Sequence, residues 1–212
     1  MVDLIGVVAL LFLVVMVYPA LISWASGFSL PLRILVDLSP YIVSIGVIVG
    51  ICSLRGMAPG SGLGFSTDHL ARQVKIALVL FAGTILFVVV PVLLGIDALG
   101  EPETRTFQFI YQILRTFFVV GLGEELIWRG FVLGKANAAL GSENAGIIAS
   151  SVLFGLWHYP AGQDVFQVIA TAVIGLVYGV ARSKIKHCST LATGLAHGLH
   201  GTAIIVMTRF LA

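Results

Sequence analysis

The chain has 212 residues, of which 58% are hydrophobic and only 10% are charged. A soluble domain has about 25% charged residues, because much of its surface faces water. This composition excludes a soluble domain, a disordered chain and a coiled coil, and it predicts an all-α protein that crosses a lipid bilayer several times. The net charge of +2 is too small to indicate a nucleic-acid partner.

Apolar stretches long enough to form membrane helices recur along the whole chain. A spanning helix needs about 20 mostly apolar residues. The sequence predicts a polytopic transmembrane helical bundle of about seven helices, in chain order over residues 4–24, 35–54, 74–96, 106–133, 145–157, 165–181 and 191–211. Residues 56–66 are rich in Gly and Pro and are expected to form a loop.

Positively charged side chains fall into alternate predicted loops, as they do on the cytoplasmic side of membrane proteins. One set of loops contains Arg55, Arg72, Lys75, Lys135, Arg182, Lys184 and Lys186. The other set has fewer cations beside acidic residues, namely Arg33, Arg105 and Arg209 with Asp97, Glu101 and Glu103. This distribution predicts a cytoplasmic N-terminus and a C-terminus on the other side.

Three ionisable residues lie close together inside one apolar stretch, at Glu124, Glu125 and Arg129. Each such group costs about 2.5–3.5 kcal/mol in the hydrocarbon and therefore needs a reason. Glu125 and Arg129 are four residues apart and can pair on one helix face. Glu124 is rotated by about 100° and lacks that partner. We therefore expect Glu124 to be functional, the alternative being that it anchors another helix through hydrogen bonds.

Histidines occur at matching depth on two other predicted helices. His158 follows Phe154 by four residues, and His197 and His200 lie in the last helix among Gly194, Gly198 and Gly201, which allow close helix approach. At about 1.5 Å per residue, Glu124, His158 and His197 lie about 15–20 Å from the cytoplasmic helix ends. One carboxylate and two or three imidazoles are therefore expected to meet near the middle of the membrane.

A carboxylate with two imidazoles supports two kinds of hydrolytic chemistry. Glu124, His158 and His197 could bind Zn²⁺ and leave one position open for water. Alternatively, Glu and His activate water directly while another His stabilises the oxyanion. Both suit peptide-bond hydrolysis, although the HExxH helix of soluble zinc proteases is absent. A proton-coupled carrier is the other reading of the spacing, but the chain shows no clear repeat of the kind carriers contain.

Three motifs in this region resemble those of a known family. Glu124 to Arg129 reads as EExxxR, Phe154 to His158 reads as FxxxH, and His197 matches the last conserved His. In these residues the chain resembles the CPBP intramembrane proteases, which include the type II CAAX prenyl protease and bacterial bacteriocin-processing or immunity proteins. The family often has Asn or Asp four residues after the last His, where this chain has Gly201.

The resemblance implies a role for each matching residue. Glu124 and His158 would activate the attacking water, Glu125, Arg129 and Phe154 would support the site, and His197 would bind the oxyanion or share a metal, with Zn²⁺ as the candidate cofactor. Gly201 has no side-chain donor, so His200 is a candidate substitute whose side chain points about 100° away.

The resemblance also sets expectations for the whole chain. Residues 1–105 would be N-terminal transmembrane helices without a motif, and residues 106–212 a CPBP-like catalytic helical core. The expected substrate is a membrane-associated peptide or protein, cleaved in or near the bilayer, and the expected location is a bacterial plasma membrane. The alternative from another class is a non-enzymatic immunity or partner protein.

Overall fold

The computed structural model describes residues 1–96, 99–162 and 164–211, and all regular elements within them are helices. Long helical stretches are α1 (Val2–Ala25), α2 (Leu30–Leu54), α4 (Leu70–Thr84) with α5 (Leu86–Leu93), residues 106–140, α9 (Glu143–Gly162), α10 (Val165–Lys184) and α11 (Thr190–Leu211). These seven stretches confirm the predicted all-α bundle. The expected loop over 56–66 also contains a short helix, α3 (Pro59–Gly62).

Five stretches in the described part of the chain are long and apolar enough to cross a membrane, namely Val2–Ala25, Leu30–Leu54, Leu70–Leu93, Val165–Lys184 and Thr190–Leu211. Large apolar side chains such as Leu13, Val79 and Phe210 are exposed on them. Such surfaces are stable against lipid and unstable in water. The protein is therefore an integral membrane protein.

Several helix ends differ from the sequence-based expectation. Helix α2 begins at Leu30 rather than at residue 35, because Ser29 precedes it and Pro31 fits its first turn. The stretch that begins at residue 106 continues through α8 (Leu133–Leu140), so Lys135 lies on a helix rather than in a loop. Its ammonium group is 3.6 Å from Asp3 Oδ2.

The cationic end of α10 was also expected in a loop. Arg182 and Lys184 instead form its last turn, where positive side chains are favoured by the helix dipole. Asp97, counted above with the acidic loop, lies outside the described residues.

The stretch 106–140 changes its helical winding twice. It begins as α6 (Thr106–Leu114), widens to the π-helix η1 (Arg115–Gly121), returns to α-helix in α7 (Leu122–Glu125), and widens again in η2 (Leu126–Val132) before α8. π-helical turns are rare and occur often at functional sites. Here they flank the two adjacent glutamates on both sides, a feature that apolar periodicity did not predict.

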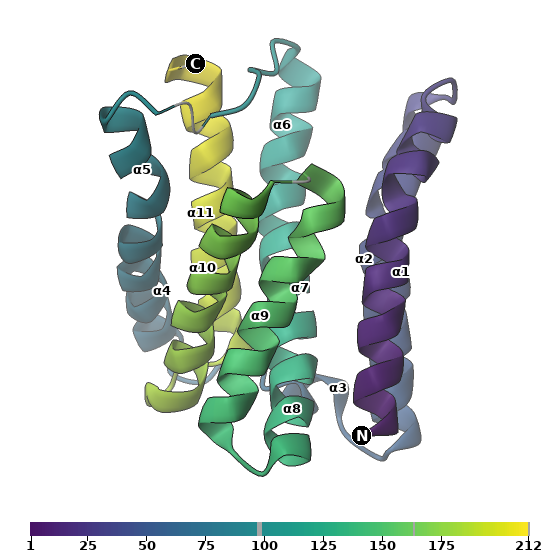
Figure 1. Ribbon diagram of the computed structural model, residues 1–212, viewed down its shortest axis with the longest axis vertical. Helices are drawn as coiled ribbons and strands as arrows, with labels where there is room; N and C mark the ends of the chain where they lie inside the picture. The colour runs from purple at the N-terminus through teal and green to yellow at the C-terminus, as the bar shows by residue number, and fades with distance from the viewer. Residues whose placement is uncertain (97–98, 163, 212) are drawn as a thin grey trace.

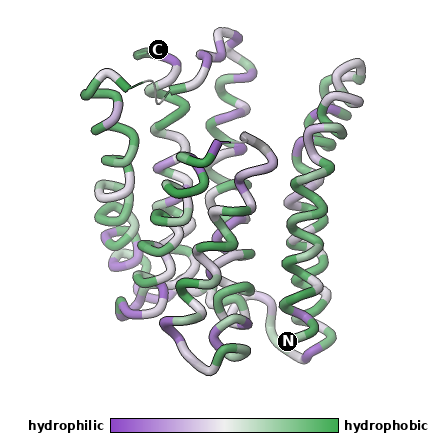
Figure 2. The backbone as a smooth tube through the Cα atoms, in the orientation of Figure 1, coloured by the Kyte–Doolittle hydropathy of each residue, from purple (hydrophilic) through white to green (hydrophobic). Residues whose placement is uncertain are grey.

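The helices form a bundle with the chain ends at opposite poles (Figure 1), as the odd number of long stretches requires. α1 and α2 lie side by side, and α9 packs between α1 and α10, while α11 contacts α4 and η1. Figure 2 shows apolar residues along the middle of the helices, with many of the hydrophilic residues near the loops and helix ends. The sidedness of these two poles stays a prediction from the charge distribution.

One apolar core crosses the boundary between the N-terminal helices and the motif-bearing half. It joins α1 and α2 to η2 and α9 through Val7, Leu11, Val15, Ile48, Cys52, Trp128, Phe131, Phe154 and Trp157, among others. The Trp157 indole also donates a hydrogen bond of 3.0 Å to the Leu11 carbonyl oxygen. The first two helices therefore hold α9 in place, although they carry no motif.

Candidate active site

Helix α7 carries the two adjacent glutamates into the middle of the bundle. Glu124 is 2% exposed and Glu125 is fully buried. Glu125 Oε1 lies 3.0 Å from Arg129 Nη1, which confirms the predicted ion pair between residues four apart. A buried charge is tolerated only when it is paired, so this contact explains how Glu125 and Arg129 occupy the bundle interior together.

Aromatic rings and a glycine enclose the Arg129 guanidinium. Its central carbon lies 4.4 Å from the ring centre of Phe154 and 5.7 Å from that of Tyr178, both cation–π contacts. A Cβ atom added at Gly175 would come within 2.9 Å of Arg129 Nη2. A side chain at residue 175 would therefore displace the guanidinium group or move α10 away from the ion pair.

His158 on α9 points its Nε2 atom toward Glu124. Its Nδ1 lies 2.8 Å from the Phe154 carbonyl oxygen. A carbonyl oxygen can only accept, so Nδ1 carries a hydrogen, and in a neutral imidazole Nε2 then holds the free lone pair. The Nε2 atom is 4.0 Å from Glu124 Oε2. Phe154 thus supports the site twice, through its ring and through its carbonyl group.

His197 on α11 bridges the two glutamates. Its Nδ1 lies 3.1 Å from Glu125 Oε1, and its Nε2 lies 3.9 Å from Glu124 Oε2. The structure therefore brings the three residues predicted as catalytic together, with both imidazoles facing one carboxylate oxygen of Glu124. That oxygen, Glu124 Oε2, is buried and accepts no hydrogen bond from the residues that the structure describes.

Glycines bring α11 close enough for His197 to reach the glutamates. A Cβ atom at Gly121 would lie 2.5 Å from the Gly198 Cα atom, and one at Gly194 would lie 2.7 Å from Leu122 Cδ2. Both distances are shorter than real carbon contacts, so larger residues there would push the helices apart. This confirms the expectation that glycines of the last helix allow close approach.

Tyr41 on α2 is a site residue that the sequence did not reveal. Its hydroxyl donates a hydrogen bond of 2.9 Å to Glu124 Oε1. The two residues are 83 positions apart, and Tyr41 belongs to no recognisable motif. The only available signal was a phenol hydroxyl within an apolar helix, where a buried tyrosine usually needs a hydrogen-bond partner.

His200 and Gly201 are not brought to the Glu124 carboxylate. The His200 side chain is buried, and its Nδ1 has no hydrogen-bond partner in the described part of the chain. A Cβ atom at Gly201 would lie 2.5 Å from Thr116 Cγ2. Thr116 of η1 therefore occupies the space that a longer side chain at position 201 would need.

The proposed zinc ligands have suitable chemistry but not the spacing of a metal site. Each imidazole is oriented through its Nδ1, as metal-bound histidines usually are. Tetrahedral zinc with bonds of about 2.0–2.1 Å holds its ligand atoms about 3.3 Å apart. The two Nε2 atoms are 4.0 Å and 3.9 Å from Glu124 Oε2, and no described group of three His, Cys, Asp or Glu is placed to hold a metal ion.

The Glu124 carboxylate opens into a cavity of about 200 Å³ between α1, α2 and α9. Glu124 and His158 line it, together with Val15, Tyr18, Pro40, Tyr41, Arg115 and Trp157. A water molecule occupies about 30 Å³ in the liquid, so the cavity has room for water and for part of a bound chain.

In this membrane helix bundle two imidazoles point toward one buried carboxylate beside a cavity. A hydrolase that works within a membrane needs such a base, such imidazoles and space for water. Residues 106–208, which include Glu124, His158 and His197, match the family model "Type II CAAX prenyl endopeptidase Rce1-like". This match to a family of membrane proteases confirms the CPBP resemblance over residues 106–208. No curated protein and no solved structure gives a significant match. Tyr41 lies outside the matched range.

Proposed function

We propose that this protein is an intramembrane endopeptidase in which Glu124 and His158 activate a water molecule. The observation that carries the proposal is the convergence of two imidazole nitrogens on Glu124 Oε2, at 4.0 Å from His158 and 3.9 Å from His197. A water that bonds two such atoms at about 2.8 Å each spans a separation of this size. The match to a protease family supports the same chemistry.

In the first step Glu124 acts as general base. It removes a proton from the water held between its carboxylate and His158 Nε2, while the water oxygen bonds to the carbonyl carbon of the substrate peptide. The Tyr41 hydroxyl holds the other carboxylate oxygen at 2.9 Å and so fixes the direction of the base. When the tetrahedral intermediate collapses, Glu124 returns the proton to the leaving amine.

His197 is placed to stabilise the negative charge that develops on the carbonyl oxygen. Its Nδ1 lies 3.1 Å from Glu125 Oε1 and donates its hydrogen to this carboxylate, so that a doubly protonated imidazole presents its Nε2–H to the oxyanion. Arg129 neutralises Glu125 from the other side at 3.0 Å. The two glutamates, Arg129 and the charged His197 together carry no net charge, as a membrane interior requires.

The cavity beside Glu124 and the surrounding apolar helices support a membrane-associated peptide or protein as substrate. The bond is then cleaved within the bilayer or next to it, and the location that fits the proposed role is the plasma membrane of a bacterium. This finer assignment rests on the family resemblance and on the charge distribution of the loops.

The decisive experiment compares the wild type with Glu124→Gln in detergent. Both proteins are incubated with a library of membrane-protein tails, and new chain termini are identified by mass spectrometry. We expect Glu124→Gln to lower cleavage by at least about 10²-fold, because the amide cannot act as base, without a change in thermal unfolding. Glu143→Gln is the matched control, since Glu143 is exposed and its carboxylate pairs, among the described residues, with Lys184 at the surface. If the two folded proteins give no difference, with no new termini found only with the wild type, the result would contradict the proposal and favour the non-enzymatic immunity role.

Chelation separates the water mechanism from a zinc mechanism. Because the donor atoms are spaced too widely for zinc, we expect cleavage to be unchanged after treatment with a strong chelator and removal of the complex. The measurement is the rate at which the same library of membrane-protein tails is cleaved. A soluble zinc protease is treated in parallel to show that chelation worked. A loss that added Zn²⁺ restores would contradict this prediction.

A further inference from the structure

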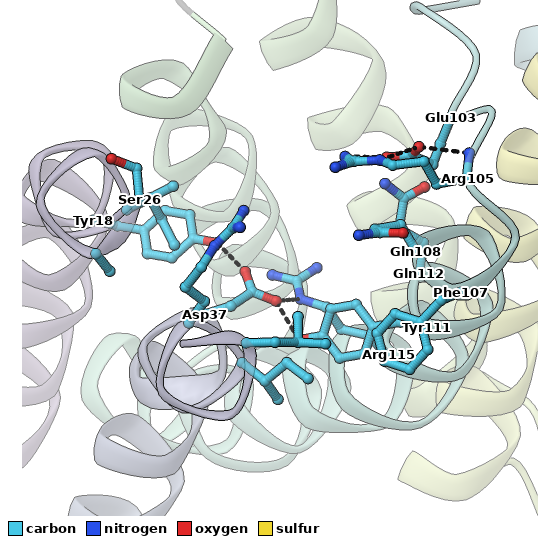
Figure 3. Close-up of a pocket in the computed structure, with 15 residues that line it drawn as sticks. Tyr18, Ser26, Asp37, Glu103, Arg105, Phe107, Gln108, Tyr111, Gln112 and Arg115 are labelled. Atoms are coloured by element: carbon cyan, nitrogen blue, oxygen red, sulfur yellow. Dashed lines mark hydrogen bonds and ion pairs between the residues drawn. The ribbon is translucent and has the colours of Figure 1, made fainter. Parts of the chain in front are cut away.

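A second cluster of charged groups lies between α1, α2 and α6, and the mechanism does not use it (Figure 3). Asp37 accepts hydrogen bonds from the Tyr18 hydroxyl and, at 2.6 Å, from the Tyr111 hydroxyl. Its Oδ2 also lies 2.5 Å from Arg115 Nε. The Asp37 and Arg115 side chains are 19% and 20% exposed. Ionisable pairs within a membrane bundle usually mark a functional path.

This cluster separates two cavities. One is the cavity at Glu124, and the other is an outer cavity of about 380 Å³ between the facing ends of α1, α2 and α6. Tyr18 and Arg115 line both cavities. The two cavities are therefore neighbours, and a chain bound in the outer cavity lies next to the cavity that holds the catalytic carboxylate.

The wall formed by α6 and the start of η1 suits a peptide backbone. Gln108, Gln112 and Arg115 follow one another at intervals of about one turn, and all three line the outer cavity (Figure 3). The two amide groups can each donate and accept hydrogen bonds, which matches the N–H and C=O groups of an extended chain. A lipid tail offers no such groups.

The outer cavity has one positive charge in excess. Its lining contains the cations Arg33, Arg105 and Arg115 and the anions Asp37 and Glu103. Arg115 pairs with Asp37, and Arg105 pairs with Glu103 at 3.0 Å, lowering the pKa of Glu103 to about 2 through a side-chain hydrogen bond. Arg33 has no acidic partner within the described residues.

We propose that the outer cavity binds the substrate segment beside the cleaved bond, and that Arg33 selects an acidic side chain in that segment. The inference rests on the proposed function, because the catalytic cavity defines where the bond lies. It assigns the selection of the acidic side chain to Arg33 of α2, which lies outside the region matching the family model.

The geometry of α2 predicts the position of this acidic residue. Arg33 and Tyr41, which contacts Glu124, are eight residues apart on α2, so they are separated by about 12 Å along the helix. An extended peptide advances about 3.3 Å per residue. The selected Asp or Glu should therefore lie about four residues from the bond that is cleaved, with a tolerance of about one position.

The test uses a peptide library with an apolar segment and randomised flanking positions, acetylated and amidated so that no chain-end carboxylate is present. Wild type, Arg33→Glu, Arg33→Gln and the control Arg72→Glu are compared, the control altering an exposed cation on α4 at the opposite pole. Thermal unfolding verifies that each variant is folded. Mass spectrometry gives the residue frequencies around each cleaved bond.

We expect the wild type and Arg72→Glu to enrich Asp and Glu about fivefold at one position, the effect of a favourable exposed ion pair. Arg33→Gln should lose this preference, and Arg33→Glu should replace it by a preference for Lys and Arg. Cleavage that depends on Glu124 but shows no preference for acidic residues would overturn the inference while the protease function stands. An acidic preference that persists in Arg33→Glu would have the same consequence. The assay is repeated with a second library whose peptides keep a free C-terminal carboxylate, and an acidic preference seen only in that second library would overturn the inference as well.

A binding measurement decides the inference if cleavage itself is not observed. The library is passed over immobilised Glu124→Gln protein and over Arg33→Glu/Glu124→Gln protein. Retention of acidic peptides by the first protein only would support Arg33 as their contact. Equal retention by both would refute it.

Discussion

Two ion pairs lie inside this bundle, and the chain assembles them in different ways. Glu125 and Arg129 are four residues apart in one continuous helical stretch, with their charged atoms 3.0 Å apart. Asp37 and Arg115 come from α2 and from η1, separated by 78 positions, with atoms 2.5 Å apart. The first pair is a consequence of local helix geometry, whereas the second exists only after two distant helices have packed.

The surroundings of the pairs differ as well. Glu125 and Arg129 are fully enclosed, at 0% and 2% exposure. Asp37 borders the outer cavity and Arg115 borders both cavities, and each side chain is about 20% exposed. Water and bound chains can compensate a broken pair beside a cavity but not one in a closed core. We therefore expect the local pair to stabilise the fold and the long-range pair to shape the path to the site.

Breaking the enclosed pair should have the largest effect on stability. In Arg129→Met the Glu125 carboxylate loses its cation, which costs about 3–5 kcal/mol for a buried pair. The free energy of unfolding in detergent, and the yield of folded protein, should both fall. The double variant Glu125→Gln/Arg129→Met is the control, because it removes the stranded charge and should recover part of the stability. Normal stability of Arg129→Met would contradict the structural role of the pair.

Breaking the pair beside the cavities should have a smaller effect. Asp37→Asn removes the anion that faces Arg115 and weakens the acceptor shared by two tyrosine hydroxyls, and we expect a loss of about 1–3 kcal/mol. Ser39→Ala is a matched control on the same helix, because in the described part of the chain the Ser39 hydroxyl donates to the Val36 carbonyl oxygen of its own helix and to no other group. A loss as large as that of Arg129→Met would mean that both pairs are structural.

The smallest change in stability is expected where the two regions meet. Tyr41 is one turn from Asp37 on α2 and donates to Glu124. Tyr41→Phe removes one hydrogen bond, about 1 kcal/mol, so the fold should remain. Because Tyr41 positions the base Glu124, its loss should lower kcat about tenfold with little change in KM. Tyr159→Phe, at an exposed tyrosine of α9, should leave both constants unchanged.

Local spacing was sufficient to predict the parts of the site that lie within single helices. The Glu125–Arg129 pair and the Phe154–His158 contact each join residues four apart, a distance fixed by helix geometry alone. The glycines of α11 also indicated close approach, since only small residues permit it. The Lys135 position was wrong because helix α8 continues beyond the apolar stretch, and apolarity alone does not locate the end of a helix.

By itself, the sequence determined that this protein is a helical membrane protein with an EExxxR motif, an FxxxH motif and a buried histidine at compatible depths. Packing alone decided that Tyr41 reaches Glu124, that Asp37 meets Arg115, and that Tyr18 and Arg115 line two neighbouring cavities. The reason is physical: a helix fixes the neighbours of residues three or four apart, whereas contacts across 70 or 80 positions depend on how all the helices fill the space between them.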